Sequence, residues 1–459
     1  ISRKCRDPMI ALASGHFAMG LFQTCFMFYY VKVYLNVFKI SEGWFSIAQG
    51  LFLVWNAVND PLFGYFQDST HSWFSNRRLV IKYLAPLISL SFVLLWVQAP
   101  YEQGLHLCVA LFLYDAFFSA IGVAWSAMFA EVEGGAVARA SAMKHSQLAI
   151  LLSVNVIPLM EKTSNSLQDF ATFQRISVLL AGVGWACFWF CANGGQGLPH
   201  HQKSSGKDEE RLLGDDGKHE KSGVLRMQSV REVLSRRDFV AILFVNAIHT
   251  ARSVMHLNFA SITTELLIPQ SILPKGSLQL STFYALCTLA PQIIAILSEG
   301  LVVRLGAHKI IQSAFLTTVA AACLLYGVSG SPYMIMVYMF IDSVTVHATA
   351  PLFNIIISEF IEDDSRRNER SKPLSSLVFG LNAFFVKPSQ SIAPLIVVHY
   401  LNGYGYEEYK KSHEASPSLI RATHSLLFIP PLFLAAAQYV AFRVYSLGER
   451  NRIHRLTTI

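Results

Sequence analysis

Long hydrophobic runs alternate with short polar intervals along almost the whole chain. Twelve of these runs approach or exceed the roughly 20 residues that an α-helix needs to cross a bilayer. They lie near residues 10–34, 43–66, 79–98, 104–129, 141–160, 174–193, 238–262, 278–302, 308–328, 332–358, 374–401 and 418–445. The pattern predicts an all-α polytopic membrane protein with twelve transmembrane helices.

One hydrophilic interval is much longer than the others. It begins "GGQGLPHHQKSSGKDEERLLGDDGKHEKSG" at residue 194 and is rich in Gly, Ser, Lys and Glu, with too little apolar surface for a core. We expect residues 196–232 to be largely disordered, with a short amphipathic helix at the end. The predicted organisation is an N-terminal six-helix half at 1–193, a cytoplasmic flexible linker at 194–237 and a C-terminal six-helix half at 238–459.

Composition and charge agree with a membrane protein. Of 459 residues, 53% are hydrophobic and 15% are charged, whereas a soluble domain is roughly a quarter charged. Most of the 37 lysines and arginines lie on the side of the membrane that holds both termini and the linker, so this side is predicted to be cytoplasmic. The net charge of +7 belongs to this asymmetry and does not indicate nucleic acid. The expected location is the plasma membrane or an endomembrane.

The two halves repeat each other. The fourth span and its following loop parallel the tenth, which places three pairs of residues at equivalent positions: Asp115 with Asp342, Glu131 with Glu359, and Arg139 with Arg370. Gly64-x-x-x-Asp68, followed by Arg77 and Arg78, is echoed by Gly300-x-x-x-Arg304 after the eighth span. Two repeated six-helix halves are the organisation of the major facilitator fold, with the substrate path between them at mid-membrane.

These repeated residues predict a conformational latch. A glycine at the end of a span lets a neighbouring helix approach closely. An acidic residue one turn later and a basic pair in the next loop can then form a charge cluster that holds one conformation. The alternative is a plain cytoplasmic cap with positive-inside arginines. The expected latch residues are Gly64, Asp68, Arg77, Arg78, Glu131, Arg139, Gly300, Arg304, Glu359 and Arg370.

The second span contains a polar stripe. Asn56, Asn59 and Asp60 are separated by three and four residues, so they share one helix face. Pro61 removes one backbone hydrogen bond and leaves a carbonyl oxygen available. We expect this stripe and Lys387 of the eleventh span to form the cation or proton coupling site, in which Lys387 pairs with Asp60 until a cation or proton competes for the carboxylate.

Other ionisable groups lie within the predicted spans, where charges are costly and usually mark a pathway. In the seventh span, His249, Arg252 and His256 share one face with Asn246. We expect a substrate cavity to be lined by Trp125, His16, His249, Arg252 and His256, with Asn56 at the same cavity. Structural roles stay open for three residues: pairing within the repeat for Asp115 and Asp342, and a hydrogen-bonded core position for His16.

Three stretches resemble a known family: "WNAVNDPLFGYFQD" at 55–68, "EVEGGAVARAS" at 131–141, and Lys387 within "LVFGLNAFFVKPSQSIAPLIVVHYL". They are similar to the glycoside–pentoside–hexuronide:cation symporters, the melibiose-permease branch of the major facilitator superfamily. The resemblance covers nearly all the spans and is strongest around the second, fourth and eleventh. It implies a secondary transporter whose coupling cation is held by acids of the second span.

The chain departs from the family at several site positions. The first of the family's two acids in the second span is Asn56 here, so sodium binding is expected to be weak and a proton is the expected coupling ion. The family's sugar-site acids and arginine match His16, Ile121 and Ser146, whereas Trp125 keeps the aromatic on which a sugar stacks. A melibiose-like substrate is therefore not expected.

The sequence favours a protein that moves a small organic solute by alternating access. The alternative is a transporter fold that acts as a non-transporting scaffold or receptor, in keeping with the missing sugar-site acids. No motif of an enzyme, a metal site or a cofactor is evident, so we expect no catalytic residues, no metal and no cofactor. The expected partners are the lipid bilayer, a small solute and H⁺ rather than Na⁺, with no nucleic acid, and the chain is expected to be a monomer.

Overall fold

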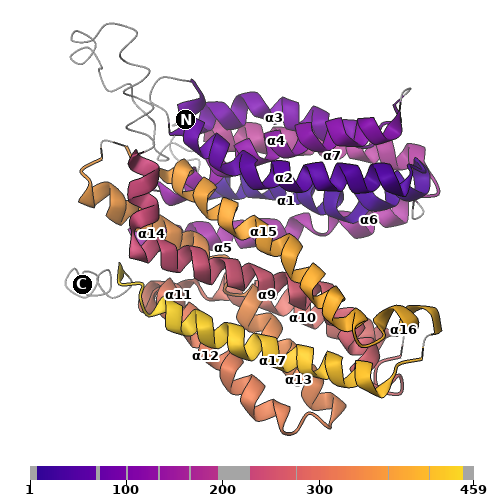
Figure 1. The fold of residues 1–459 in the computed structure, drawn as a ribbon. Coiled ribbons are helices and arrows are strands. Elements are labelled where there is room, and N and C mark those ends of the chain that lie inside the picture. Colours follow the sequence, from indigo (N-terminus) through magenta and orange to yellow (C-terminus); the bar gives the residue numbers. More distant parts are fainter. Residues whose placement is uncertain are drawn as a thin grey trace, which may run out of the picture. The chain divides into compact units, whose positions relative to one another are not determined.

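The computed structural model describes residues 8–68, 73–99, 102–132, 135–164, 167–194, 228–274, 277–370, 372–412 and 414–447. Within these ranges the chain is mostly helical and contains no β-strand (Figure 1). By its contacts the chain divides into two compact units. The first holds Ile1–Arg236 with Ile357–Phe384, and the second holds Arg237–Ile356 with Phe385–Ile459.

The first unit contains the helices of the N-terminal half. They are α1 (Pro8–Lys32), α2 (Glu42–Gln67), α3 (Arg77–Leu94), α4 (Gln103–Ala130), α5 (Gly135–Ser153), α6 (Val156–Thr163) and α7 (Phe170–Gly194). A π-helical turn at Val33–Val37 extends α1, and a 3₁₀ turn at Trp73–Ser75 precedes α3. This unit also includes a short helix over residues 228–235, most of α14 (Leu352–Arg367) and the first part of α15 (Ser375–Asn402).

The second unit contains the remaining helices. They are α9 (Arg237–Leu267), α10 (Leu278–Leu297), α11 (Glu299–Leu305), α12 (Ala307–Tyr326), α13 (Pro332–His347), α16 (Tyr406–Ser412) and α17 (Pro417–Phe442), together with the rest of α14 and α15. A hydrophobic core joins α10 to α13 through Phe283, Cys287, Ile335 and Met339. Helices α9, α15 and α17 meet through Phe259, Val397 and Leu419.

Polar residues before several helices fix where those helices begin. The Ser41 hydroxyl accepts a hydrogen bond from the Trp44 amide at 3.3 Å and so caps α2. The Asn76 side chain accepts from the Arg78 and Leu79 amides at 3.2 and 3.4 Å and caps α3. Ser277 and Ser416 cap α10 and α17 in the same way. Each cap satisfies a backbone donor that the helix itself leaves without an acceptor.

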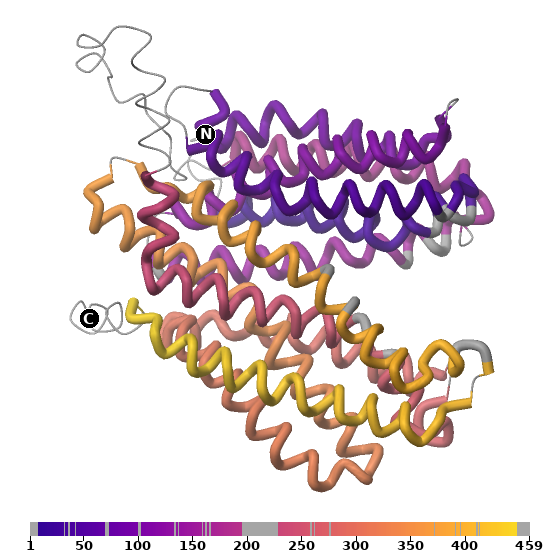
Figure 2. Tube along the Cα trace, in the orientation of Figure 1, coloured from indigo at the N-terminus to yellow at the C-terminus, as the bar shows by residue number. Residues whose placement is uncertain are grey.

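The same packing order occurs in both units (Figure 2). In the first unit α4 packs against α2 and α3, and α7 packs against α1 and α3. In the second unit α13 packs against α10 and α12, and α17 packs against α9 and α12. These are equivalent helices under the repeat read from the sequence. The internal repeat therefore extends from single residues to the packing of the helices.

The helices follow the predicted spans closely. Nine helical segments in the described ranges are long and apolar enough to cross a membrane, when α13 and α14 are taken as one segment. The other three predicted spans correspond to α2, α3 and α5 with α6. Polar and charged positions interrupt the apolar character of these helices, as the stripe from Asn56 to Asp60 does in α2.

One predicted span differs in detail. The run at 332–358 is two helices, α13 and α14, separated by a turn at residues 348–351. Pro351 has no N–H to continue the hydrogen-bond ladder, which accounts for the break. In contrast, α2 continues through Pro61.

The structure describes residues 228–237 at the end of the predicted linker. The helix over 228–235 agrees with the expected short helix, and Val233 is fully buried. The expected disorder falls mainly on residues 195–227, which lie outside the described residues. The boundaries of the two sequence halves stay a prediction, since residues 357–384 belong by their contacts to the first unit.

Candidate functional site

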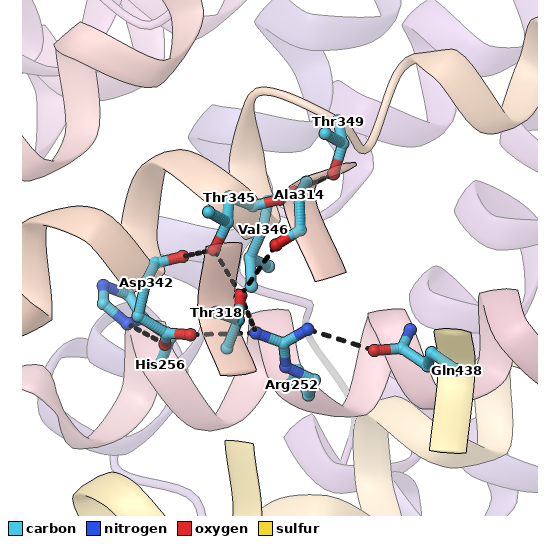
Figure 3. Close-up of polar contacts among 9 residues, drawn as sticks. All are labelled: Arg252, His256, Ala314, Thr318, Asp342, Thr345, Val346, Thr349 and Gln438. Carbon is cyan, nitrogen blue, oxygen red and sulfur yellow. Dashed lines mark hydrogen bonds and ion pairs between the residues drawn. The ribbon is translucent and has the colours of Figure 1, made fainter. Parts of the chain in front are cut away.

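A buried charge cluster lies in the second unit, between α9 and α13 (Figure 3). Arg252 and His256 are one turn apart on α9 and face Asp342 on α13. The Arg252 Nη2 atom is 2.9 Å from Asp342 Oδ1, and the His256 Nδ1 atom is 3.0 Å from Asp342 Oδ2. Each carboxylate oxygen thus has its own partner, and the three side chains are almost entirely shielded from solvent.

Neutral polar groups complete the surroundings of Arg252. Its Nη1 donates to Gln438 Oε1 at 3.0 Å, and its Nη2 donates to Thr318 Oγ1 at 3.1 Å. Gln438 is itself held by its amide, which donates to the Val245 carbonyl at 3.0 Å. A buried guanidinium is tolerated only when paired and hydrogen-bonded, so α12, α13 and α17 together stabilise this charge on α9.

A cavity of about 50 Å³ lies beside the cluster, entirely within the second unit. Its charged end is formed by Arg252, His256 and Asp342, and Thr263 lies about three turns beyond Arg252 along α9. The rest of its wall is apolar and comes from four helices, through Met255, Phe259, Ala260, Met339, Val397, Leu426, Leu427, Pro431 and Leu434. An apolar wall with a few convergent polar groups is typical of small-ligand sites, although this cavity is much smaller than their usual volume of roughly 300–1,000 Å³.

Two further histidines flank the cluster. His249 is buried and its ring lies 4.8 Å from that of Phe353. Neither ring nitrogen of His249 is within hydrogen-bonding geometry of another described residue. His347 contacts the Ser253 hydroxyl at 3.3 Å through Nδ1, and its ring lies 5.4 Å from that of His256. The second unit therefore gathers three histidines around one ion pair.

In the first unit, His16 and Trp125 stack on each other, with ring centroids 4.3 Å apart and an interplanar angle of 17°. The Trp125 indole donates to the Leu12 carbonyl at 2.9 Å, and His16 Nδ1 is 3.3 Å from the Ser146 carbonyl. The positions that match the family's sugar site are thus adjacent here. However, the Trp125 side chain is buried and its indole N–H is already bonded.

The polar stripe of α2 faces two different helices. Asn59 donates through a short hydrogen bond to Asp115 on α4, and both are buried. Asp60 is also buried. A Cβ at Gly380 of α15 would lie 2.6 Å from the Asp60 backbone carbonyl oxygen, so α2 and α15 are in close backbone contact here. Asn56 is half-buried. Lys387 is half-buried too but belongs to the second unit, so its pairing with Asp60 stays a prediction.

The latch residues that follow α2 meet within the first unit. Arg77 Nη2 lies 2.6 Å from Asp68 Oδ1 and 3.3 Å from Glu131 Oε1, so one guanidinium joins the ends of α2 and α4. The other Asp68 oxygen accepts the Leu377 amide of α15 at 2.6 Å. Burial raises the pKa of Asp68 above its usual range, against the opposing effects of Arg77 and the Leu377 amide.

Gly64 lets α2 and α15 approach each other. A Cβ at this position would lie 2.4 Å from the Ser376 carbonyl oxygen, so the contact requires glycine. Gln67 and Ser376 add a hydrogen bond of 3.3 Å at the same crossing. Gly300 differs, because a Cβ there would meet nothing within 4 Å. Thus only the first copy of the repeated glycine makes a close helix contact among the described residues.

The other predicted latch residues lie elsewhere. Arg139 pairs with Glu362 at 2.9 Å, and Arg370 pairs with Asp364 at 2.8 Å and with Glu232 at 3.1 Å. Arg78 and Glu359 are buried, whereas Arg304 is exposed. Of the predicted latch residues, Asp68, Arg77 and Glu131 form one compact cluster, whereas Arg139 and Arg370 pair separately with residues of α14. That these contacts hold one conformation stays a prediction.

Comparison with known proteins agrees with this architecture. The family described as MFS/sugar transport protein, where MFS is the major facilitator superfamily, matches residues 11–449. The chain belongs to this family. It is also 25% identical to Transmembrane protein 180 of Gallus gallus over 473 residues, covering 94% of this chain and 91% of that protein. The corresponding protein of Mus musculus is 25% identical over 435 residues, covering 88% and 82%.

Solved transporters share the fold. The human organic anion transporter MFSD10 (TETRAN) aligns with a TM-score of 0.60 and 13% identity, over 96% of this chain and 98% of that one. A bacterial homologue of the iron transporter ferroportin, in an outward-facing state, aligns with a TM-score of 0.61 and 12% identity, over 96% and 99%. The predicted major facilitator fold is thereby confirmed, and the chain is a multi-pass membrane protein of a transporter family.

Several side-chain contacts between helices of this chain were not predicted from its sequence. Gln438 and Thr318 complete the shell of Arg252, and Arg236 pairs with Asp363 at 2.5 Å. The sequence does indicate a polar contact for Gln438, because this residue is an amide within the apolar run "PLFLAAAQYVAF". The sequence gives no such indication for Thr318, since only the tertiary packing brings α12 to Arg252 of α9.

The ion pair of the second unit predicts a double-mutant effect. Arg252→Met leaves the Asp342 carboxylate buried without its main counter-charge, and should lower the free energy of unfolding by about 3–5 kcal/mol. Arg252→Met with Asp342→Leu removes both charges and should recover most of this loss. The exposed Arg304→Met is the control. Thermal unfolding of the purified chain in detergent measures all four proteins, and equal losses in the single and double variants would contradict the pairing.

The two repeated glycines predict opposite effects of one substitution. Alanine at an open helical position is worth up to about 1 kcal/mol over glycine, so Gly300→Ala should stabilise the chain. Gly64→Ala places a Cβ against the Ser376 backbone and should destabilise it by about 1–3 kcal/mol. Thermal unfolding compares the pair. A stabilising Gly64→Ala would show that α2 and α15 do not approach as described.

Proposed function

We propose that this chain is a secondary transporter that moves a small organic solute by alternating access, coupled to protons. The observation that carries the proposal is the buried Arg252–Asp342–His256 cluster beside its cavity. Buried charges in a membrane protein are expensive and are kept mainly along substrate or proton pathways. Membership of a transporter family supports the same conclusion.

Within the superfamily, we place the chain in the melibiose-permease-like branch, as the glycoside–pentoside–hexuronide:cation symporter motifs of α2, α4 and α15 suggest. A sugar is not the proposed solute. One face of Trp125 is covered by His16, and the acids that would hold sugar hydroxyls are replaced by His16 and Ile121.

The proposed coupling ion is a proton. Asp60 is the one acid left in the polar stripe of α2, because the first of the family's acids is Asn56. A sodium ion prefers several oxygen ligands with adequate negative charge, and a single carboxylate offers little. Asp60 would exchange its proton in competition with Lys387, while Trp125, Asn56, His249, Arg252 and His256 line the solute path. The termini and linker would face the cytoplasm, and the chain would act as a monomer.

Solute uptake tests the transport proposal. Purified chain in proteoliposomes is offered sugars, nucleosides, amino acids and organic acids, with a sodium gradient and a pH gradient imposed separately. The expected result is accumulation that follows the pH gradient and is indifferent to sodium. Uptake that tracks sodium at fixed pH would overturn the proton proposal. No uptake of any solute by a folded chain would favour the scaffold or receptor alternative.

The Asp60–Lys387 pairing makes a separate prediction. Asp60→Asn should leave the half-buried Lys387 without its proposed counter-charge and reduce surface expression, at a cost below the roughly 3–5 kcal/mol of breaking a fully buried pair. Asp60→Asn with Lys387→Met should restore expression but not proton-coupled transport. Quantitative surface labelling with a stability assay in detergent compares the variants. Equal expression of the single and double variants would contradict the pairing.

A further inference from the structure

Two nitrogens of the charge cluster, Arg252 Nε and His256 Nε2, make no hydrogen bond to another described residue, and of the two only the histidine nitrogen can take up a proton. The Nδ1 atom of His256 is hydrogen-bonded to Asp342 (Figure 3). The same side chain lines the cavity. A cavity of about 50 Å³ has space for water next to this ring, because one water needs roughly 10–15 Å³. Protons can therefore reach Nε2 without breaking the ion pair.

The formal charge of the site depends on that nitrogen. Arg252 and Asp342 cancel, so the site is neutral when His256 is neutral. Protonation at Nε2 makes the cluster +1 while both hydrogen bonds to Asp342 stay in place. A net charge in a buried, largely apolar site is costly unless a counter-ion enters with it. The energetically consistent occupant of the protonated site is an anion.

Few other charged groups lie around the ring to neutralise it. On α9 the titratable neighbours are Arg252 and His249, and on α13 they are Asp342, His347 and Tyr338. The lining residues from α15 and α17 are Val397, Leu426, Leu427, Pro431 and Leu434, none of which is charged. Among the described lining residues, Asp342 is the sole acid, and Arg252 already balances it.

We propose that the Arg252–Asp342–His256 site binds one proton and one short-chain carboxylate together. The proton forms the N–H bond at His256 Nε2, and this N–H donates to the carboxylate of the ligand. The alkyl chain then lies against Met255, Phe259 and Met339. The proposal rests on the proposed transport function and specifies its substrate class, since a proton and a monovalent anion cross together without net charge.

The size and polarity of the cavity limit the ligand. Its volume accommodates only a few heavy atoms, and its wall beyond the charged end offers one hydroxyl, that of Thr263. A sugar or nucleoside would leave several hydrogen-bonding groups unsatisfied there. An alkylammonium of the same length would add a second positive charge beside Arg252. Propionate fits these requirements, and propylammonium is its matched counter-example.

Isothermal titration calorimetry of the full chain in detergent tests the proposal with propionate. Propionate is ionised throughout the range of pH 6 to 8, so each propionate that binds to the neutral site should take up one proton. The affinity should fall as the pH rises, by about tenfold for each unit of pH where that uptake is complete. Titrations in phosphate and in Tris, which differ in ionisation enthalpy, count the protons directly. Propylammonium should not bind.

His256→Gln provides the matched variant, because its amide can still donate to Asp342 but cannot take a proton. It should weaken propionate binding by roughly tenfold to a hundredfold, the value of one charge-assisted hydrogen bond, and abolish proton uptake. His424→Gln is the control, since His424 on α17 bonds to Ser329 and does not line the cavity. If His256→Gln does not fold, the pH dependence of the unmodified chain still decides the question.

The outcomes separate this inference from the proposed function. Three results would overturn the inference: no binding of propionate, binding without proton uptake, or an affinity for propionate that His256→Gln leaves unchanged. If another solute is then taken up along a pH gradient, the transport function stands without it. Proton-linked propionate binding by a chain that transports nothing would support the site and reject transport.

Discussion

The cost of placing a charge in an apolar interior governs this structure. Arg252 pairs with Asp342 while Thr318 of α12 and Gln438 of α17 accept further hydrogen bonds from its two Nη atoms, and its Nε is left without an acceptor among the described residues. Arg77 is held in a comparable way by Asp68 and Glu131. In each case a single arginine fixes the mutual positions of several helices, since any displacement would separate charges that water cannot reach.

The two units share one helix-packing plan but use their equivalent carboxylates differently. Asp115 and Asp342 occupy matching positions, yet Asp115 accepts a hydrogen bond from the neutral Asn59, whereas Asp342 meets Arg252 and His256. The first carboxylate is therefore joined to the helix that carries Asp60, and the second has a partner that can change its charge. The repeat supplies the scaffold, and the partners on neighbouring helices determine the chemistry.

Hydrophobic periodicity predicted the helices well, because spans of this length leave few alternatives for a backbone in lipid. The spacing of Gly64, Asp68 and Arg77 likewise predicted a charge cluster, since short-range geometry brings the end of α2 to the start of α3. The sequence could not reveal that Leu377 and Ser376 complete it, as they lie some 300 residues away. Arg252 and His256 were predicted as cavity residues from their shared face, but their common partner depends on how α9 packs against α13.

The division of α15 between the two units has a mechanical consequence. The helix joins the first unit up to Phe384 and the second from Phe385 onward. Pro388, which lies inside the helix, has no N–H to donate to the Phe384 carbonyl four residues earlier. The helical ladder is thus weakened at the point where the contacts change from one unit to the other. A helix bends most easily where a backbone hydrogen bond is missing, so one of the two weakened turns of α15 coincides with this change of contacts, next to Lys387, and Pro394 makes the other.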